Sequence, residues 1–416
     1  MPATISADET WAGNGVTHLV PGTIAITGTA TVTVQPCAIV SLGTGASINV
    51  NNSARLVSAG SGSGGTVSFV PTNSTAPWGA LRGNSATSLI DLSWTTLQGA
   101  GALGGQGANS AITVAGPGYS VTPVPVLRVS NVTIDSPQGG GVYLDTSGAF
   151  TSDSTGLTIR GAIDYVLSST MMALQSIPPG SYADASNGHP VVDVIGPNAN
   201  VFADLTIHNY LPVRIKTSGM TVRPPPTGTG PVTLTLEPGA RIRFARVVAA
   251  PGALVEFGSN GNAPNNQVGV LVAQGTAADP IVFTSDETAP APGDWFGLWL
   301  ATSPGSQLDH VVIEYAGAAG SGISSNNCKP VGAQDAAALF VGDFDTQYVP
   351  PATLLTNSTI RYSAGFGIDA VWLAPTVNAP NLTAGNTFQN NALCTQTFNG
   401  LVPPAICGTN QGCTVP

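Results

Sequence analysis

Residues 231–244 read PVTLTLEPGARIRF, and residues 30–42 read ATVTVQPCAIVSL. In both stretches Val, Leu, Ile and Thr alternate with other residues, and a turn containing Pro separates two such runs. Alternation with a period of two, bounded by Gly, Pro, Asn or Ser, is typical of short β-strands. Similar runs recur every ~8–10 residues across most of the chain, whereas helical periodicity is nearly absent. The sequence therefore predicts an all-β fold of many short strands.

Composition excludes several classes of protein. The chain has 416 residues, a net charge of -10 and only 8% charged residues. Against the usual ~25% of charged residues, this argues against a coiled coil or an ordinary helical enzyme. The 42% hydrophobic content argues against disorder, and the negative charge argues against a nucleic-acid binder. No run of ~20 apolar residues is present, so no membrane-spanning helix is expected.

The chain contains one internal duplication with a unit of about 200 residues. Segments of the first half match segments of the second half in the same order. The matched segments begin at Ala30 and Pro231, at Gly65 and Asp279, at Ser88 and Ser306, and at Val126 and Thr353. We expect each copy to hold several coils of ~20–25 residues. We predict a first copy over 1–185, a Pro-rich junction over 186–230, a second copy over 231–392 and a Cys-containing tail over 393–416.

A solenoid explains this pattern better than other β architectures. Stacked coils repeat the same small and branched residues, and they disfavour charge because identical charges would lie ~5 Å apart. Asparagines near the turns can bond to the neighbouring coil. The asparagines expected to do so are Asn131, Asn357, Asn386, Asn390 and Asn391. A pair of β-sandwiches remains the alternative.

Several stretches of the second copy carry a resemblance. They are LTLEPGARIRF, VGVLVAQGTAADPIVFTSD, PGDWFGLWL, SQLDHVVIEYAGA and NSTIRYSAGFGI. They resemble the coil motifs of exported bacterial right-handed parallel β-helix proteins, which belong to the pectate-lyase-like superfold. The resemblance is clearest over 230–392 and weaker over 20–170, where Trp78 keeps a tryptophan but Pro77 replaces its acidic neighbour. It implies a right-handed parallel β-helix and export, but no activity, because function does not follow from fold.

The cysteines bear on the compartment. We expect one or two disulfides in the loop-like C-terminal part, where a small core makes them most useful, with reduced thiols as the alternative. The candidates are Cys328, Cys394, Cys407 and Cys413. Cys37, within a strand-like run, is expected to be a buried core residue. No signal peptide is expected in residues 1–13, so we predict a secreted or cell-surface protein whose signal has been removed.

Acidic residues gather in the second copy and suggest a carbohydrate-facing groove. Ten of the 22 lie between Asp279 and Asp369. Glycosidases need two carboxyl groups about 5–10 Å apart, a spacing that adjacent coils can supply. The weak catalytic candidates are Asp309, His310, Glu314, Asp335, Asp343 and Asp345. A lyase would instead need Ca²⁺ and a base such as Arg361. Solvated turn residues are the simpler interpretation, and no metal or cofactor beyond a possible Ca²⁺ is predicted.

Aromatic residues offer a second kind of site. Trp295 and Trp299 share one strand face in DWFGLWL, so both are expected to point outward. An exposed pair of this kind can stack on sugar rings or contact a partner protein. Trp372 is a third candidate, and the alternative is that the segment 285–293 covers the pair.

Six of the 12 basic residues of the chain lie between Arg214 and Arg246. They predict neutralising surface charges or, more specifically, either an anion-binding edge or a contact for the acidic region of another molecule, which would favour head-to-tail association. Thr alternation over Thr27–Val34 also allows ice binding, but the pattern is not sustained. We therefore expect an exported, non-catalytic β-helix that binds a polysaccharide or surface protein on its lateral face. The alternative is a polysaccharide lyase or glycoside hydrolase.

Overall fold

The computed structural model describes residues 1–397 apart from short gaps. The gaps are 63, 102–108, 120–121, 197–198, 227, 229, 247–249, 259–266, 302, 322, 324–335, 343–349 and 371–379. The chain divides into two units, Met1–Gly196 (unit 1) and Pro197–Pro416 (unit 2). The predicted boundaries are finer than this division and stay a prediction.

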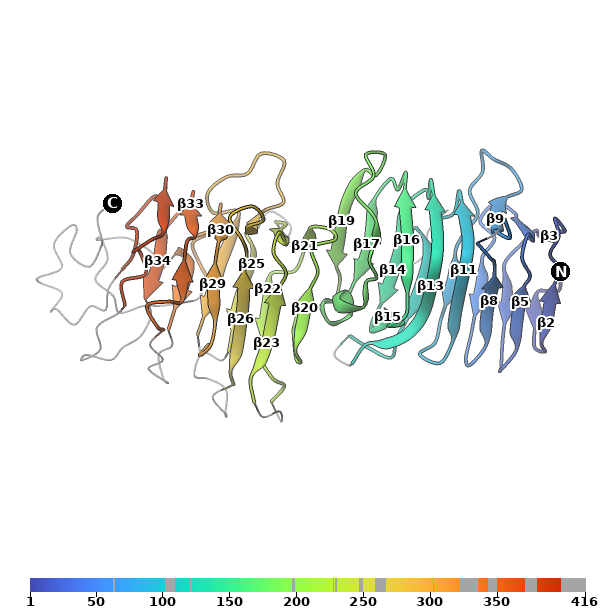
Figure 1. The fold of residues 1–416 in the computed structure, drawn as a ribbon, viewed down its shortest axis with the longest axis horizontal. Helices are drawn as coiled ribbons and strands as arrows, with labels where there is room; N and C mark the ends of the chain where they lie inside the picture. Colours follow the sequence, from blue (N-terminus) through green and yellow to red (C-terminus); the bar gives the residue numbers. More distant parts are fainter. Residues whose placement is uncertain are drawn as a thin grey trace, which may run out of the picture. The chain divides into compact units, whose positions relative to one another are not determined.

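Unit 2 winds in coils, and each coil contributes one strand to each of three faces (Figure 1). The β20 face contains β20 (Leu205–Ile207), β23 (Val232–Leu236), β26 (Gly269–Gln274), β29 (Gln307–Asp309) and β32 (Leu355–Thr356). The β21 face contains β21 (Val213–Ile215), β24 (Arg241–Phe244), β27 (Ile281–Ser285), β30 (Val311–Glu314), β33 (Thr359–Arg361) and β35 (Thr387–Gln389). The β22 face contains β22 (Gly219–Val222), β25 (Gly252–Phe257), β28 (Trp295–Leu300), β31 (Ala337–Val341) and β34 (Phe366–Ala370).

Unit 1 is also a stack of parallel strands, and its strands form two sheets. One sheet runs through β1 (Thr4–Ile5), β4 (Ile24–Ile26), β7 (Ile48–Val50), β10 (Leu81–Gly83), β12 (Ser110–Ala115), β14 (Gly140–Asp145), β17 (Tyr165–Ser169) and β19 (His189–Val194). The other runs through β2 (Glu9–Trp11), β5 (Thr31–Val34), β8 (Arg55–Ala59), β11 (Leu89–Gln98), β13 (Val124–Asp135), β16 (Thr155–Arg160) and β18 (Gly180–Ser181). Paired with it are β3 (Thr17–Val20), β6 (Ile39–Leu42), β9 (Val67–Pro71) and β15 (Gly148–Phe150). A short 3-10 helix covers Met171–Ser176.

The coils bury rows of aliphatic side chains. In unit 2 one such row comprises Ile207, Leu236, Ala273, Leu308 and Leu355. In unit 1 another comprises Ile24, Ile48, Leu81, Ile112, Val142, Leu167 and Val192. Burying one Val, Ile or Leu side chain stabilises a fold by about 1.5–3 kcal/mol, so the stacked rows explain why the alternating runs become strands. Within each unit, every pairing between the named strands is parallel, which confirms the predicted β-solenoid and makes the sandwich alternative unnecessary.

The predicted coil length is right only for part of unit 1. Thr4 pairs with Ala25, a step of 21 residues, which matches the prediction. In unit 2, however, Leu205 pairs with Leu234 and Leu308 with Leu355, so the steps are 29 and 47 residues. Loops between strands lengthen these coils, and alternation within strands carries no information about such insertions.

The asparagines and cysteines follow the predictions in part. Asn386 and Asn391 accept bonds from, and donate to, the backbone of the preceding coil, as expected. Cys37 is not a core residue: it is a half-buried free thiol in a turn, with φ of 65°. A left-handed turn residue cannot point into the core as a strand residue does. Cys394 is disulfide-bonded. The other candidate cysteines lie outside the described residues, so the predicted pairing stays a prediction.

Candidate functional site

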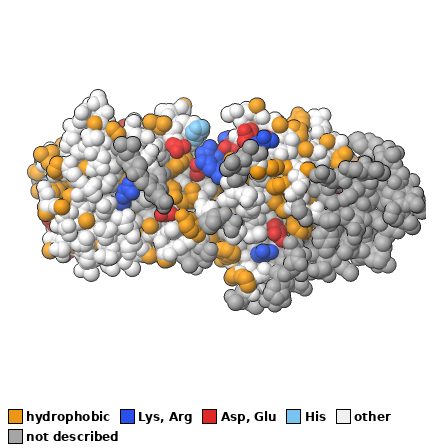
Figure 2. All heavy atoms as spheres, turned by 180° about the vertical axis from the view of Figure 1, so that it is seen from behind, with side chains coloured by type: hydrophobic (Ala, Val, Ile, Leu, Met, Phe, Trp, Pro, Cys, Tyr) orange, Lys and Arg blue, Asp and Glu red, His pale blue; other side chains and the backbone are white. Residues whose placement is uncertain are grey.

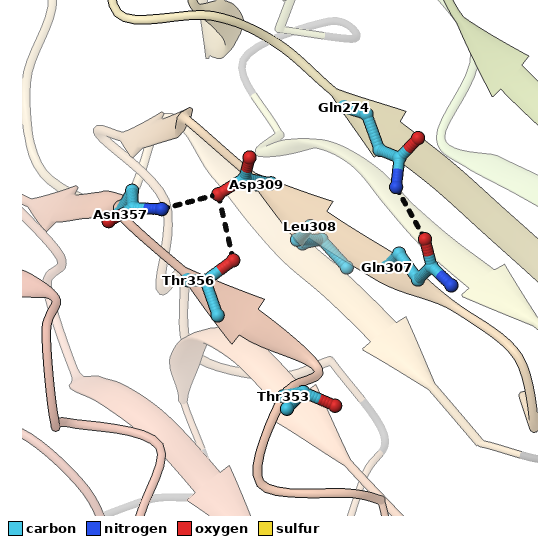
Figure 3. A pocket seen from close by; sticks show the side chains of 7 residues that line it. All are labelled: Gln274, Gln307, Leu308, Asp309, Thr353, Thr356 and Asn357. Atoms are coloured by element: carbon cyan, nitrogen blue, oxygen red, sulfur yellow. Dashed lines mark hydrogen bonds between the residues drawn. The ribbon is translucent and has the colours of Figure 1, made fainter.

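An open groove of about 400 Å³ lies on the β20 face of unit 2 (Figure 3). It is lined by Gln274, Gln307, Leu308, Asp309, Thr353, Thr356 and Asn357. These residues come from three successive coils, on β26, β29 and β32 and the turns beside them. Most of the lining is therefore amide, hydroxyl or carboxylate.

The strand register places the polar side chains in one row. Gln274 pairs with Asp309, and Asp309 pairs with Thr356. The neighbouring residue on each strand, such as Leu308, points into the core, so the row faces outward. Neighbouring strands lie ~4.8 Å apart, which brings side chains of adjacent coils within hydrogen-bonding reach.

Asp309 is the centre of the groove. Its Oδ1 accepts hydrogen bonds from the Asn357 amide and the Thr356 hydroxyl, both at 2.8 Å, and its Oδ2 lies 3.0 Å from Nδ1 of His310. The Asn357 amide, helped by Thr356 and His310 and opposed by burial, holds the pKa of Asp309 below its usual range. The side chain is therefore a fixed carboxylate at neutral pH.

Two glutamines extend the groove beside Asp309 (Figure 3). Nε2 of Gln274 donates to Oε1 of Gln307 at 2.5 Å. Within the described part of the chain, Nε2 of Gln307 has no partner, and neither do Oε1 of Gln274 and Oδ1 of Asn357. The groove therefore keeps both donors and acceptors for a ligand.

Among the catalytic candidates that the structure describes, Asp309 and His310 lie together, whereas Glu314 lies apart from them. His310 is a corner residue with φ of 49° that contacts Asp309. Glu314 lies on the β21 face, buried, where it accepts bonds from Arg361 at 2.7 Å and Thr284 at 2.9 Å. Arg361 is thus held by Glu314, which argues against its predicted role as a base. Residues 335, 343 and 345 lie outside the described residues, so the described candidates supply no carboxylate pair in one groove.

Trp295 and Trp299 share one side of β28, as their spacing predicts, because they pair with Gly252 and Glu256 on the same side of β25. Neither tryptophan is exposed. The Trp295 ring stacks on Phe244 with a centroid distance of 4.1 Å, and its Nε1 donates to a backbone carbonyl of β30 at 2.9 Å. The predicted exposed platform is therefore wrong for Trp295.

Trp299 is also covered. It belongs to a buried apolar cluster with Ile323, Phe340 and Phe366, and its Nε1 donates to the Gly342 carbonyl at 3.0 Å. The alternation of side chains along the strand correctly predicts that both tryptophans lie on the same side of β28. It does not show that further residues pack over this side of the sheet. Trp372 lies outside the described residues.

Three arginines of the basic segment form ion pairs with two residues of the acidic segment within unit 2. Arg214 and Arg243 stack on adjacent coils, and Asp286 lies 3.4 Å and 3.7 Å from them. Arg246 pairs in the same way with Asp294 at 3.2 Å. Figure 2 shows acidic and basic side chains side by side in small groups on the visible face. Head-to-tail association stays a prediction, with less unpaired charge to support it.

Sequence reasoning missed most of the groove. Its residues come from three separate segments, around Gln274, Gln307 and Asn357, and only the strand register brings these together. The sequence would predict this row of polar residues only if the length of each coil were known, because that length determines which residues pair. No group of His, Cys, Asp or Glu in the described part of the chain could hold a metal ion, and the possible Ca²⁺ site stays a prediction.

Fold and groove together define a class, the parallel β-solenoid with a polar lateral groove. No protein-family model matches the chain, and no curated protein or solved structure is significantly similar to it. The resemblance to exported bacterial β-helix proteins therefore stays a prediction at the level of family. Among the described residues, no helix is long and apolar enough to cross a membrane.

The lowered pKa of Asp309 predicts a pH-dependent contribution to stability. A carboxylate whose pKa is lower in the folded state stabilises the fold above its unfolded pKa, and this contribution disappears as the pH falls through the folded pKa. The urea midpoint of Asp309→Asn should therefore lie below that of the wild type at pH 7, and the two should converge in strong acid. A difference that stays constant down to pH 2 would contradict this. Gln389→Ala, which changes no ionisable group, is the control.

Proposed function

We propose that this chain is an exported or cell-surface β-solenoid that binds a neutral glycan in the groove on the β20 face, without catalysis. The observation that carries the proposal is the set of amide and carboxylate groups on Gln274, Gln307, Asp309 and Asn357, held in one open row. Export and the identity of the glycan are part of the proposal.

Hydroxyl groups fit this row because each of them both donates and accepts a hydrogen bond. The groove offers the N–H groups of Gln307 as donors and the side-chain oxygens of Gln274 and Asn357 as acceptors. Asp309 adds a charged acceptor, and hydrogen bonds to a charged group are stronger than those between neutral groups. A ligand with many hydroxyl groups would therefore satisfy the groove better than an apolar one.

The charge of the groove favours a neutral ligand. Its lining contains one carboxylate and no Lys or Arg. An acidic polysaccharide would bring its own carboxylates towards Asp309 without a cation to balance them, and like charges in a partly enclosed site repel each other. We therefore expect neutral oligosaccharides to bind and oligogalacturonate to bind poorly.

The groove is better suited to binding than to hydrolysis. A general acid needs a raised pKa, whereas the pKa of Asp309 is lowered. A hydrolase also needs a second carboxyl group beside the scissile bond, and the groove lining supplies one only. The lyase or hydrolase alternative now depends on Asp335, Asp343 and Asp345, which lie outside the described residues.

A screen of immobilised neutral and acidic oligosaccharides, followed by calorimetric titration of the best neutral hit, tests the proposal. Asp309→Asn and Gln307→Ala should each weaken binding about tenfold, the equivalent of one lost hydrogen bond to a ligand. Gln389→Ala is the control, because Gln389 is exposed like Gln307 but lies on the β21 face. Equal affinity of all four proteins, or preferential binding of oligogalacturonate, would contradict the proposal.

A further inference from the structure

The outward row of polar side chains in the groove continues over two further coils of the β20 face, whose strands lie side by side in Figure 1. Leu236 pairs with the last residue of β20 and with Ala273 of β26. One residue further on, this register places Glu237 between His208 and Gln274. The residues before them are buried, so the three side chains point outward. We call the following five residues the polar row: His208, Glu237, Gln274, Asp309 and Thr356.

Direct contacts hold His208 and Glu237 in place. Nδ1 of His208 lies 2.7 Å from Oε1 of Glu237, and the backbone N–H of Asn209 donates to Oε2 of Glu237 at 3.2 Å. The Tyr210 ring stacks on His208 with a centroid distance of 5.0 Å. These contacts fix the orientation of both side chains.

Both side chains of this pair are accessible to a ligand. That of His208 is 27% exposed, and that of Glu237 is 36% exposed. A carboxylate only accepts, so Nδ1 of His208 donates to it and Nε2 is left for another group. Within the described part of the chain, Nε2 of His208 makes no hydrogen bond. Each oxygen of Glu237 accepts one bond and can accept a second. The pair therefore offers hydroxyl groups a charged acceptor and a free imidazole nitrogen.

We propose that the glycan of the groove is a linear, extended chain that runs along the polar row, and that Glu237 and His208 bind its outer rings. This inference rests on the proposed function, because it concerns the same ligand. Adjacent strands lie ~4.8 Å apart, which is close to the advance per ring of an extended β-1,4-linked glycan. The three coils of the groove would then receive about three rings, and the two further coils about two more.

The straight row selects the shape of the glycan. An extended chain meets one polar side chain of the row at each ring, whereas an α-1,4-linked chain curves and leaves a straight row after a few rings. We therefore expect β-1,4-linked neutral glycans to gain affinity with length and α-1,4-linked ones not to.

The longer row does not make the site a hydrolase. Glu237 and Asp309 lie two coils apart, with Gln274 between them, so the two carboxylates face different rings. The carboxyl groups of a glycosidase instead flank one scissile bond.

Calorimetric titration with β-1,4-linked gluco-, manno- and xylo-oligosaccharides of three and five rings tests the inference. The wild type should bind five rings of the best series at least tenfold more tightly than three, the equivalent of one further hydrogen bond to a charged group. His208→Ala and Glu237→Ala should each remove this gain and leave the affinity for three rings nearly unchanged. Malto-oligosaccharides of the same lengths should show no gain.

Asp135→Ala is the matched control. Asp135 also pairs with a basic side chain of the adjacent coil, Arg160 at 3.1 Å, but it lies in unit 1. Urea midpoints establish that each variant is folded. Glu237→Gln keeps the shape of the side chain and should also lose most of the gain, so it replaces Glu237→Ala if that variant does not fold.

The outcomes separate the longer row from the groove. A five-ring gain that is lost in both row variants and kept in Asp135→Ala supports the inference. Equal affinity of the wild type for three and five rings, or a gain that persists in both row variants, overturns it and leaves the groove standing. An equal gain with malto-oligosaccharides overturns the extended shape of the ligand. If the wild type binds neither length of any series, the proposed function fails and the inference fails with it.

Discussion

Trp295→Ala should lower the free energy of unfolding by about 3–5 kcal/mol, the usual cost of truncating a buried tryptophan. Trp295 is fully buried, stacks on Phe244 and donates to a backbone carbonyl. The substitution therefore removes ring contacts, leaves a cavity and strands a buried acceptor. Urea unfolding followed by circular dichroism measures the effect.

Trp295→Phe is the matched variant. It keeps an aromatic ring against Phe244 but loses the indole N–H, so we expect a cost of about 1–2 kcal/mol. The same pair of variants distinguishes a core residue from a sugar platform. A Trp295→Ala protein that unfolds like the wild type, and that has lost glycan binding, would mean that the ring is exposed after all.

Arg361→Ala should lower the free energy of unfolding by about 2–4 kcal/mol. Arg361 makes two contacts to Oε2 of Glu314, at 2.7 Å from Nε and 2.6 Å from Nη2. The Glu314 side chain is only 9% exposed, whereas that of Arg361 is 39% exposed. Removing the arginine leaves a buried carboxylate with Thr284 as its remaining partner. Breaking a fully buried pair costs about 3–5 kcal/mol, and water reaching the vacated position should reduce this.

Two variants control this prediction. Arg241→Ala removes an exposed arginine of the same face and should change the free energy of unfolding by less than about 0.5 kcal/mol. The double variant Glu314→Met, Arg361→Met removes both charges and should recover part of the loss, because no buried charge remains. An Arg361→Ala protein as stable as Arg241→Ala would show that Glu314 is solvated.

The sequence predicts the fold because the solenoid repeats one local pattern, the alternation of inward and outward residues along each strand. Alternation in residues 31–34 and 232–236 places Val and Leu inward at every second position, and both segments are parallel strands. Each of the matched segments of the two halves contains a strand in both units, for example β9 and β27. Loop lengths between strands escape this rule, which is why the coils of unit 2 are longer than predicted.

The site could be predicted only in part. Asp309 stands out by charge, and it is the centre of the groove. Its partners Gln274 and Asn357 come from other coils, so finding them needs the register. Glu314 stood out equally by charge but lies on another face, paired with Arg361. Residue type thus identifies candidate site residues, and the stacking of the coils determines which of them lie in the same groove.

Hydrogen exchange tests the central claim, a glycan-binding groove on the β20 face, most directly. Amide exchange by mass spectrometry would compare the free protein with the protein saturated with the best-binding neutral oligosaccharide. We expect slower exchange in peptides covering residues 307–310 and 353–357, and no change in the peptide covering residues 387–389. Protection restricted to other peptides, with residues 307–310 unaffected, would contradict the account.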